Sequence, residues 1–344
     1  MRSPQRRRIG LLMRVEIPVS LLQDSDGNEN AELVVKLISF FREARHDWAI
    51  SPLDVEAVDT FCRLNVPNFA QAYGLLAQKA SAAHVWRPRG SSAGVVTVAA
   101  DTLAEDVRDL ERAAVLVVEN ATYDWQMIKG LALVLGCEDI VRAEQASRLI
   151  VYNGGGMAGA AWHAVDQADR FTRTKRVVLV IDSDSFQPGE RTKNHAHGEK
   201  VVERGGSSHV LKFREMENYI PNRVLAYQPK GAKGYSDMAK RLKSLKCLSH
   251  EQRAHFDMKK GFKGKPVQGS AASTYHVPPE HGGLYNGVGV GDLVVLQEGF
   301  GTSLPQLFLK SVERGGIAER DLDGLGLGAT QELRLMLGKI RSVI

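Results

Sequence analysis

Residues 176–184 read Arg176-Val177-Val178-Leu179-Val180-Ile181-Asp182-Ser183-Asp184, an apolar run that passes directly into two acids. A continuous apolar run of this length is typical of a strand that is covered on both faces of a parallel sheet. Similar runs occupy residues 113–118, 148–152 and 209–213, and helical patterns at 123–135 and 158–171 separate the first three. The alternation predicts an α/β domain with a parallel sheet and right-handed crossovers.

Acidic residues follow three of these four runs. Glu119 follows the first run, Asp182 and Asp184 follow the third, and Glu215 and Glu217 come shortly after the fourth. The carboxyl ends of parallel strands meet at one edge of a sheet, where ligands bind. Clustered carboxylates repel one another unless a cation neutralises them, and oxygen ligands suit Mg²⁺ or Mn²⁺. Such a metal can activate water for phosphodiester cleavage.

Glu215 and Glu217 are two residues apart, so both point to one face if the backbone stays extended. A turn after Phe213 would separate them, and in that case we favour Glu217. Any one of these acids alone is more simply explained as a helix cap or a solvated loop residue. Several acidic elements after strands of one sheet weaken that explanation.

Three short segments resemble the motifs of TOPRIM domains. They are Val-Val-Glu-Asn at 117–120, Val-Ile-Asp-Ser-Asp at 180–184 and Arg-Glu-Met-Glu-Asn-Tyr at 214–219. TOPRIM domains occur in topoisomerases, primases and OLD-type nucleases, and the third segment is similar to OLD-like and defence-associated nucleases. The resemblance covers about residues 113–225, a third of the chain. It implies a Rossmann-like parallel sheet flanked by helices.

The resemblance also implies roles for individual residues. Glu119 would be a metal ligand or general base, Asp182 and Asp184 metal ligands, and Glu217 a ligand of a second metal. OLD-type nucleases use a lysine that follows the TOPRIM core to stabilise the transition state, and Lys259 or Lys260 matches it. Ordinary binding of backbone phosphates is the alternative role for these two lysines.

The chain departs from the family pattern at two positions. The family often has glycine after the first glutamate, where this chain has Asn120, and a second acid where this chain has Tyr123. Asp124 comes one residue later and could reach the site from the first turn of the helix. This acid therefore joins the candidate metal ligands.

A basic segment follows the predicted core. Residues 221–270 contain twelve Lys and Arg against three acids, a charge of +9, so the rest of a chain of net charge +5 carries −4. Such a segment is typical of a surface that binds a phosphate backbone, and a solubilising helical face is the alternative. The candidate nucleic-acid contacts are Lys240, Arg241, Lys243, Lys246, Arg253 and Lys263.

Two other polar stretches are explained more simply by local structure. Gly154-Gly155-Gly156 predicts a tight turn between a strand and a helix, with contact to a phosphate as the alternative. His195 and His197 lie in a polar insertion that we expect to be a solvated loop.

Length and composition set the broad class. The chain has 344 residues, 43% hydrophobic and 25% charged, as in an ordinary protein of about two domains. We divide it into a mixed α/β module at 1–105 for dimerisation or partner docking, a TOPRIM core at 106–225 and a basic helical region at 226–344. Three scattered cysteines, no apolar run of membrane-spanning length and no signal peptide favour the cytoplasm.

The expected function is that of a metal-dependent nuclease acting on DNA, with RNA as a further possibility. The chain contains no P-loop, so we expect an ATPase or sensor to come from a partner protein, within an anti-phage or anti-plasmid system. A homodimer is possible. The alternatives are a non-cutting TOPRIM module that binds DNA or regulates, and a TOPRIM subunit of an SMC-type defence complex.

Overall fold

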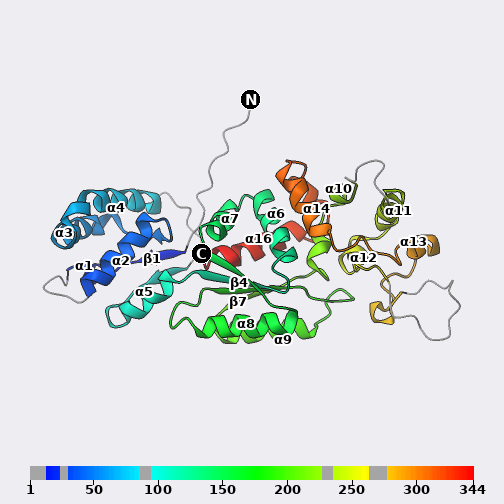
Figure 1. Cartoon of the computed structure of the whole chain (residues 1–344), viewed down its shortest axis with the longest axis horizontal. Helices are drawn as coiled ribbons and strands as arrows, with labels where there is room; N and C mark the ends of the chain where they lie inside the picture. Colours follow the sequence, from blue (N-terminus) through cyan, green and yellow to red (C-terminus); the bar gives the residue numbers. More distant parts are fainter. Residues whose placement is uncertain (1–12, 24–29, 86–93, 227–234, 263–276) are drawn as a thin grey trace, which may run out of the picture.

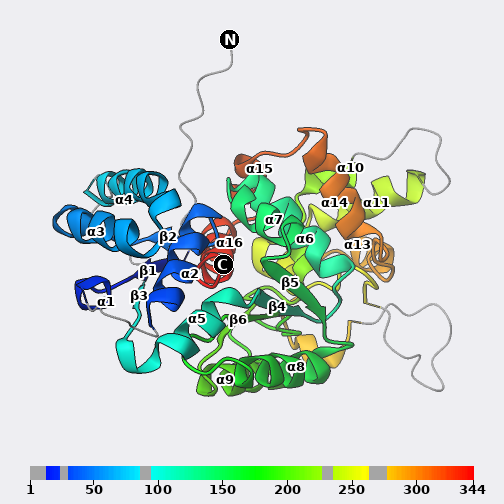
Figure 2. The same cartoon turned by 60° about the vertical axis from the view of Figure 1, so that its left-hand side comes forward.

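The computed structural model describes residues 13–23, 30–85, 94–226, 235–262 and 277–344. The chain forms a smaller module at its N-terminal end and a larger α/β unit, which lie beside one another in Figures 1 and 2. Each contains a parallel sheet, and the two units do not share a hydrophobic core. Among the described residues, none of the helices combines the length and apolar character that crossing a bilayer requires.

The N-terminal module is built on a short parallel sheet with strand order β2-β1-β3. Its elements are β1 (Arg14–Glu16), α1 (Val19–Gln23), α2 (Asn30–Arg42), β2 (Asp47–Trp48), η1 (Pro52–Asp54), α3 (Val55–Asn65), η2 (Pro67–Phe69), α4 (Ala70–Val85), β3 (Val95–Thr97), η3 (Ala100–Thr102) and α5 (Leu103–Glu111). The core of this module includes Leu103, Val107 and Leu110 of α5. The core boundary therefore falls between α5 and β4, a few residues after the predicted division at 105. The loop expected at 86–92 lies outside the described residues.

The larger unit contains a four-stranded parallel sheet with order β5-β4-β6-β7. Its elements are β4 (Ala114–Val118), α6 (Tyr123–Val134), α7 (Glu138–Gln145), β5 (Leu149–Asn153), α8 (Met157–Asp169), β6 (Val177–Ile181), α9 (Lys193–Glu203) and β7 (Ser207–Val210). Helices α8 and α9 lie on one side of the sheet, and α6, α7 and α16 lie on the other (Figure 1). The predicted parallel α/β architecture is confirmed.

Alternate residues of the central strands enter two separate cores. Ala114, Leu116 and Val118 of β4 pack on the side of α6 and α7, whereas Val115 and Val117 pack against the alanine-rich face of α8. Side chains alternate along a strand, so a run that is buried on both faces must be apolar throughout. This is the physical reason for the continuous apolar runs in the sequence.

The C-terminal elements are mostly helices. They are η4 (Met216–Tyr219), α10 (Asn222–Ala226), α11 (Tyr235–Leu245), α12 (His250–Ala254), η5 (Pro279–His281), α13 (Val290–Val295), α14 (Leu304–Glu313), α15 (Glu319–Asp323) and α16 (Ala329–Arg341). Leu333, Met336 and Leu337 of α16 share one core with β4 and β6. The predicted division at 225/226 is therefore not a boundary between hydrophobic cores.

Two local predictions need correction and one is confirmed. The polar insertion around His195 is the helix α9 rather than a loop, and it begins with a capping box between Thr192 and His195. The fourth strand spans Ser207–Val210 and ends before Phe213. Residues 154–156 form the expected tight turn between β5 and α8, and a Cβ on Gly154 would lie only 2.4 Å from the Cβ of Ala160.

Candidate metal centre

The strand register brings the ends of β4 and β6 to one edge of the sheet. Val118 pairs with Val180, and Ile181 pairs with Val210 of β7. Glu119 and Asp182 are the next residues after β4 and β6, so they lie at the same edge. The main chain bends after β7 and returns toward β6, since Met216 N donates to Asp182 Oδ1 at 2.9 Å.

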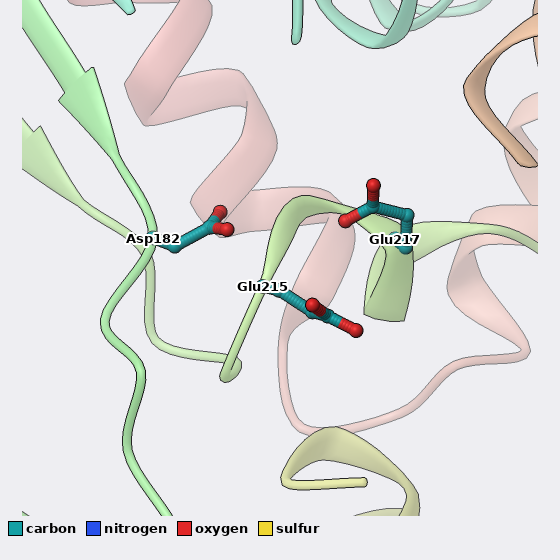
Figure 3. Close-up of side chains that lie close together, drawn as sticks. All are labelled: Asp182, Glu215 and Glu217. Atoms are coloured by element: carbon teal, nitrogen blue, oxygen red, sulfur yellow. The ribbon is translucent and has the colours of Figure 1, made fainter. Parts of the chain in front are cut away.

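Asp182, Glu215 and Glu217 converge at this edge (Figure 3). Each offers a carboxylate oxygen, and the three atoms all lie within 4.8 Å of one another. Glu215 and Glu217 are buried and Asp182 is partly exposed. The prediction that a turn after Phe213 would separate the two glutamates is wrong. Glu215 stays extended, and the η4 turn that starts at Met216 brings Glu217 back to the same cluster.

The side chains after Glu217 hold this turn in place. Asn218 accepts from Glu215 N at 3.0 Å and donates to the carbonyls of Arg253 and Phe256. The hydroxyl of Tyr219 donates to the buried carboxylate of Glu332 on α16. The Asn-Tyr pair therefore has a scaffolding role, and it fixes the backbone that presents Glu217.

Lys259 is the cation of the cluster. Its ammonium group lies 3.1 Å from Glu215 Oε2 and 3.2 Å from Glu217 Oε2. The other oxygen of Glu215 accepts from the backbone amides of Met258 and Lys259, at 2.6 and 3.3 Å. Glu215 therefore positions the loop that carries the lysine. Lys260 is exposed, and its backbone amide donates to Asp257.

Glu119 and Asp124 belong to the same electrostatic cluster. Asn120 forms a turn after β4 by accepting from the amides of Thr122 and Tyr123, and Asp124 accepts from Asn120 N at 2.8 Å. This turn starts α6 and directs Asp124 back toward the sheet edge. The charges of Glu119 and Glu217 both raise the pKa of Asp124, so these carboxylates lie near one another.

Asp184 lies near Glu119, because burial and then the charge of Asp184 raise the pKa of Glu119. Its φ of 54° is unusual for a residue other than glycine. Its backbone amide donates to Arg214 O, and Asn194 Nδ2 lies 3.4 Å from its Oδ2 and 3.0 Å from Asp182 O. Asn194 therefore links the two aspartates. Its Oδ1 is buried and has no hydrogen-bond partner within the described residues.

The cluster shifts the pKa values of its members upward. Burial is the largest cause for Asp124 and Glu215, and nearby carboxylates add to it, so each pKa rises to about 7. Burial also raises the pKa of Asp182 well above its usual value and raises that of Glu119. Burial lowers the pKa of Lys259, but Glu215, Glu217 and Asp182 raise it by more. The lysine is therefore charged at neutral pH.

The donor set fits a divalent cation. Five carboxylates interact with the Lys259 ammonium group, those of Glu119, Asp124, Asp182, Glu215 and Glu217, and Asp184 interacts with Glu119. Buried like charges of this number require protons or a cation to balance them. Carboxylate oxygens without nitrogen or sulfur ligands suit Mg²⁺ or Mn²⁺. Asp182, Glu215 and Glu217, whose oxygens lie within 4.8 Å of one another, would hold such an ion.

The candidate nucleic-acid contacts have different surroundings. Lys240, Lys243 and Lys246 are exposed, whereas Arg241 is half-buried and pairs with Glu298. Arg253 is buried and donates to the carbonyls of Asn218 and Ile220 at 2.7 and 2.6 Å. Its prediction as a nucleic-acid contact is wrong, because both terminal nitrogens hold the η4 turn. Lys263 lies outside the described residues.

Comparisons with known proteins returned no match to any family model, curated protein or solved structure.

Proposed function

We propose that this chain is a metal-dependent nuclease with a TOPRIM catalytic core. The observation that carries the proposal is the convergence of Asp182, Glu215 and Glu217 beside the Lys259 ammonium group. Four parallel strands supply the edge at which these groups meet, and the acids follow the strands at which the TOPRIM resemblance expects them. The cofactor is Mg²⁺ or Mn²⁺.

The residues divide the chemical work. Asp182, Glu215 and Glu217 would hold the cation, with Asp124 and Asp184 beside them. A bound divalent cation supplies an activated water and stabilises the oxygen that leaves phosphorus. Glu119 has a raised pKa and accepts a proton from water more readily than an ordinary carboxylate does. Lys259 places positive charge where the phosphate becomes more negative.

The substrate is DNA, with RNA as the related alternative. The exposed lysines Lys240, Lys243 and Lys246 recur at intervals of three residues on and just after α11, so their ammonium groups form a stripe that suits a phosphate backbone. Phosphate contacts carry no base information, so cleavage by the core alone is expected to tolerate many sequences. A nuclease of this kind needs control. We therefore propose that a partner ATPase or sensor controls the nuclease and that it acts in anti-phage or anti-plasmid defence. We also propose that the chain forms a homodimer.

The test is cleavage of supercoiled plasmid with Mg²⁺, with Mn²⁺ and with EDTA. The Asp182→Ala/Asp184→Ala variant is compared with Glu203→Gln, which changes an exposed acid on α9. Metal-dependent nicking or linearisation that only the aspartate variant loses supports the proposal. Cleavage that persists in EDTA or in the aspartate variant contradicts it. Salt-sensitive DNA binding without cleavage favours a TOPRIM module that binds and does not cut.

A further inference from the structure

A cavity of about 400 Å³ lies behind the loop that carries the two aspartates. Ser183 and Ser185 line it, while Asp182 and Asp184 on the same loop belong to the acidic cluster. The loop therefore carries side chains to both places, with Asp184 at a φ of 54° rather than in the extended conformation. The volume falls in the range of about 300–1,000 Å³ that is typical of small-ligand pockets.

His255 lines this cavity, and its hydrogen bonds fix which ring nitrogen is an acceptor. Ser183 Oγ donates to Phe213 O at 2.8 Å, and Ser185 Oγ lies 2.9 Å from Ser183 Oγ. The carbonyl oxygen can only accept, so the Ser183 hydroxyl uses its proton there and accepts from Ser185. The Ser185 hydroxyl in turn accepts from His255 Nδ1, which lies 3.1 Å away. The neutral ring then keeps its lone pair on Nε2. Burial lowers the pKa of His255, which favours this neutral form.

His195 lines the same cavity, and its ring proton is also placed by a hydrogen bond. Its Nδ1 accepts from the backbone amide of Thr192 at 3.1 Å in the capping box of α9. A backbone amide can only donate, so the ring proton resides on Nε2. Two histidines that line the cavity therefore have tautomers fixed by the fold, with a donor on Nε2 of His195 and an acceptor on Nε2 of His255.

The rest of the lining suits a flat ring. Leu211 and Phe213 are buried and supply an apolar floor. The exposed charges at the cavity are mixed: Arg191 and Lys212 are basic, and Glu190 and Glu251 are acidic. Leu327 also lines the cavity with 46% of its side chain exposed, so it is available to cover a ligand.

We propose that this cavity binds one base of the nucleic-acid strand whose phosphate lies at the acidic cluster. The inference rests on the proposed function for its substrate class. Every base carries neighbouring donors and acceptors on its pairing edge and a flat apolar face, which proteins read by hydrogen bonds and stacking. The shared loop at 182–185 places base and phosphate on opposite sides of the same few residues.

The test measures binding in EDTA, so it does not depend on cleavage. A short fluorescent single-stranded oligonucleotide is compared with a series in which each position in turn lacks its base. We expect one abasic position to weaken binding about tenfold, as for loss of a stacked base. Leu327→Trp, which fills the cavity mouth, should abolish that difference. Leu335→Trp is the matched control, because Leu335 is exposed on α16 and does not line the cavity.

A second variant separates recognition from folding. His195→Gln keeps the capping box, since glutamine at this position also accepts from the cap amide, but it removes the imidazole. It should reduce the abasic effect while the melting temperature stays close to that of the wild type. The four deoxynucleoside monophosphates are added as competitors. If a monophosphate displaces the oligonucleotide from the wild type but not from Leu327→Trp, base binding is supported. A free nucleotide would then be a second ligand of the cavity.

Two results overturn the inference. One is an abasic series in which no position changes the affinity, and the other is an unchanged abasic effect in Leu327→Trp. Either result can occur while metal-dependent cleavage is intact. Conversely, the oligonucleotide affinities can still be measured if the plasmid assay contradicts the nuclease proposal. Failure of base binding and failure of the nuclease proposal are therefore distinguishable.

Discussion

The ammonium nitrogen of Lys259 lies 3.2 Å from a carboxylate oxygen of Glu217, although the two residues come from different segments of the chain. The lysine belongs to the acidic cluster and is held there through Glu215, whose second oxygen accepts from the Lys259 backbone amide. This contact identifies Lys259, rather than Lys260, as the lysine of the site. The sequence alone did not distinguish the two.

Lys259→Met is predicted to lower the cleavage rate by about 100- to 1,000-fold, the usual cost of removing a group that stabilises transition-state charge. Lys260→Met should leave the rate close to the wild-type value, because that side chain is exposed. Initial rates of plasmid nicking measure both. Lys259→Arg controls for folding, since it keeps a cation beside Glu215 and Glu217. Equal losses in the Lys259→Met and Lys260→Met variants would argue against this assignment.

Without metal, stability is predicted to fall as the pH rises from about 5 to about 8. The pKa values of Asp124 and Glu215 are raised to about 7 in the folded chain, so the folded state binds more protons than the unfolded state in this window. Raising the pH removes those protons and their contribution to stability. Thermal melting in EDTA measures the effect. A saturating divalent cation, or the Asp124→Asn/Glu215→Gln variant, should flatten the profile, and a rise in melting temperature with pH would refute the explanation.

Arg176→Met is predicted to destabilise the chain without altering the metal site. The buried guanidinium donates to Val343 O at 2.8 Å and to Leu110 O at 3.0 Å, so it links the end of α5 to the C-terminus of the chain. Leaving such carbonyls without a donor costs about 1–3 kcal/mol each. Urea unfolding should show the loss, and Mn²⁺ affinity should stay the same. Arg170→Met is the control, because it changes an exposed arginine that pairs with Asp166.

Lys240, Lys243 and Lys246 are predicted to control the salt dependence of DNA binding. Replacing all three by Gln should lower the slope of log affinity against log salt by about 0.9 for each lysine that contacts a phosphate of duplex DNA. Fluorescence anisotropy across a salt series measures this slope. Arg253→Gln should act differently, through lower stability, because its guanidinium is buried against backbone carbonyls. An unchanged slope in the triple variant would exclude this stripe as the DNA contact.

The sheet and its edge could be predicted from the sequence because strands that are buried on both faces consist entirely of apolar residues. Strands such as Ala114–Val118 and Val177–Ile181 must be apolar at every position, and an acid at the next residue is then conspicuous. Glu119 and Asp182 were identifiable for this reason. Helix α9 was not, because its capping box uses histidine at the position where glutamate or glutamine is usual.

The remaining site residues depend on tertiary contacts that leave no local pattern. Glu215 enters the cluster because its extended backbone precedes a turn whose position is set by Asn218 and Arg253. Arg253 was mistaken for a surface cation, since sequence cannot distinguish a buried guanidinium from an exposed one. Lys259 could be proposed only as one of two adjacent lysines, and the contact with Glu215 distinguishes it.

Titration of the metal-free chain with Mn²⁺ in a calorimeter shows whether the buried acids form a divalent-cation site. We expect binding that releases protons at pH 7, because Asp124 and Glu215 have pKa values near 7 without metal. The Asp182→Asn/Glu217→Gln variant should lose this binding, and Glu203→Gln should keep it. The absence of binding in the wild type, or equal binding in the Asp182→Asn/Glu217→Gln variant, would contradict a cation site formed by these acids.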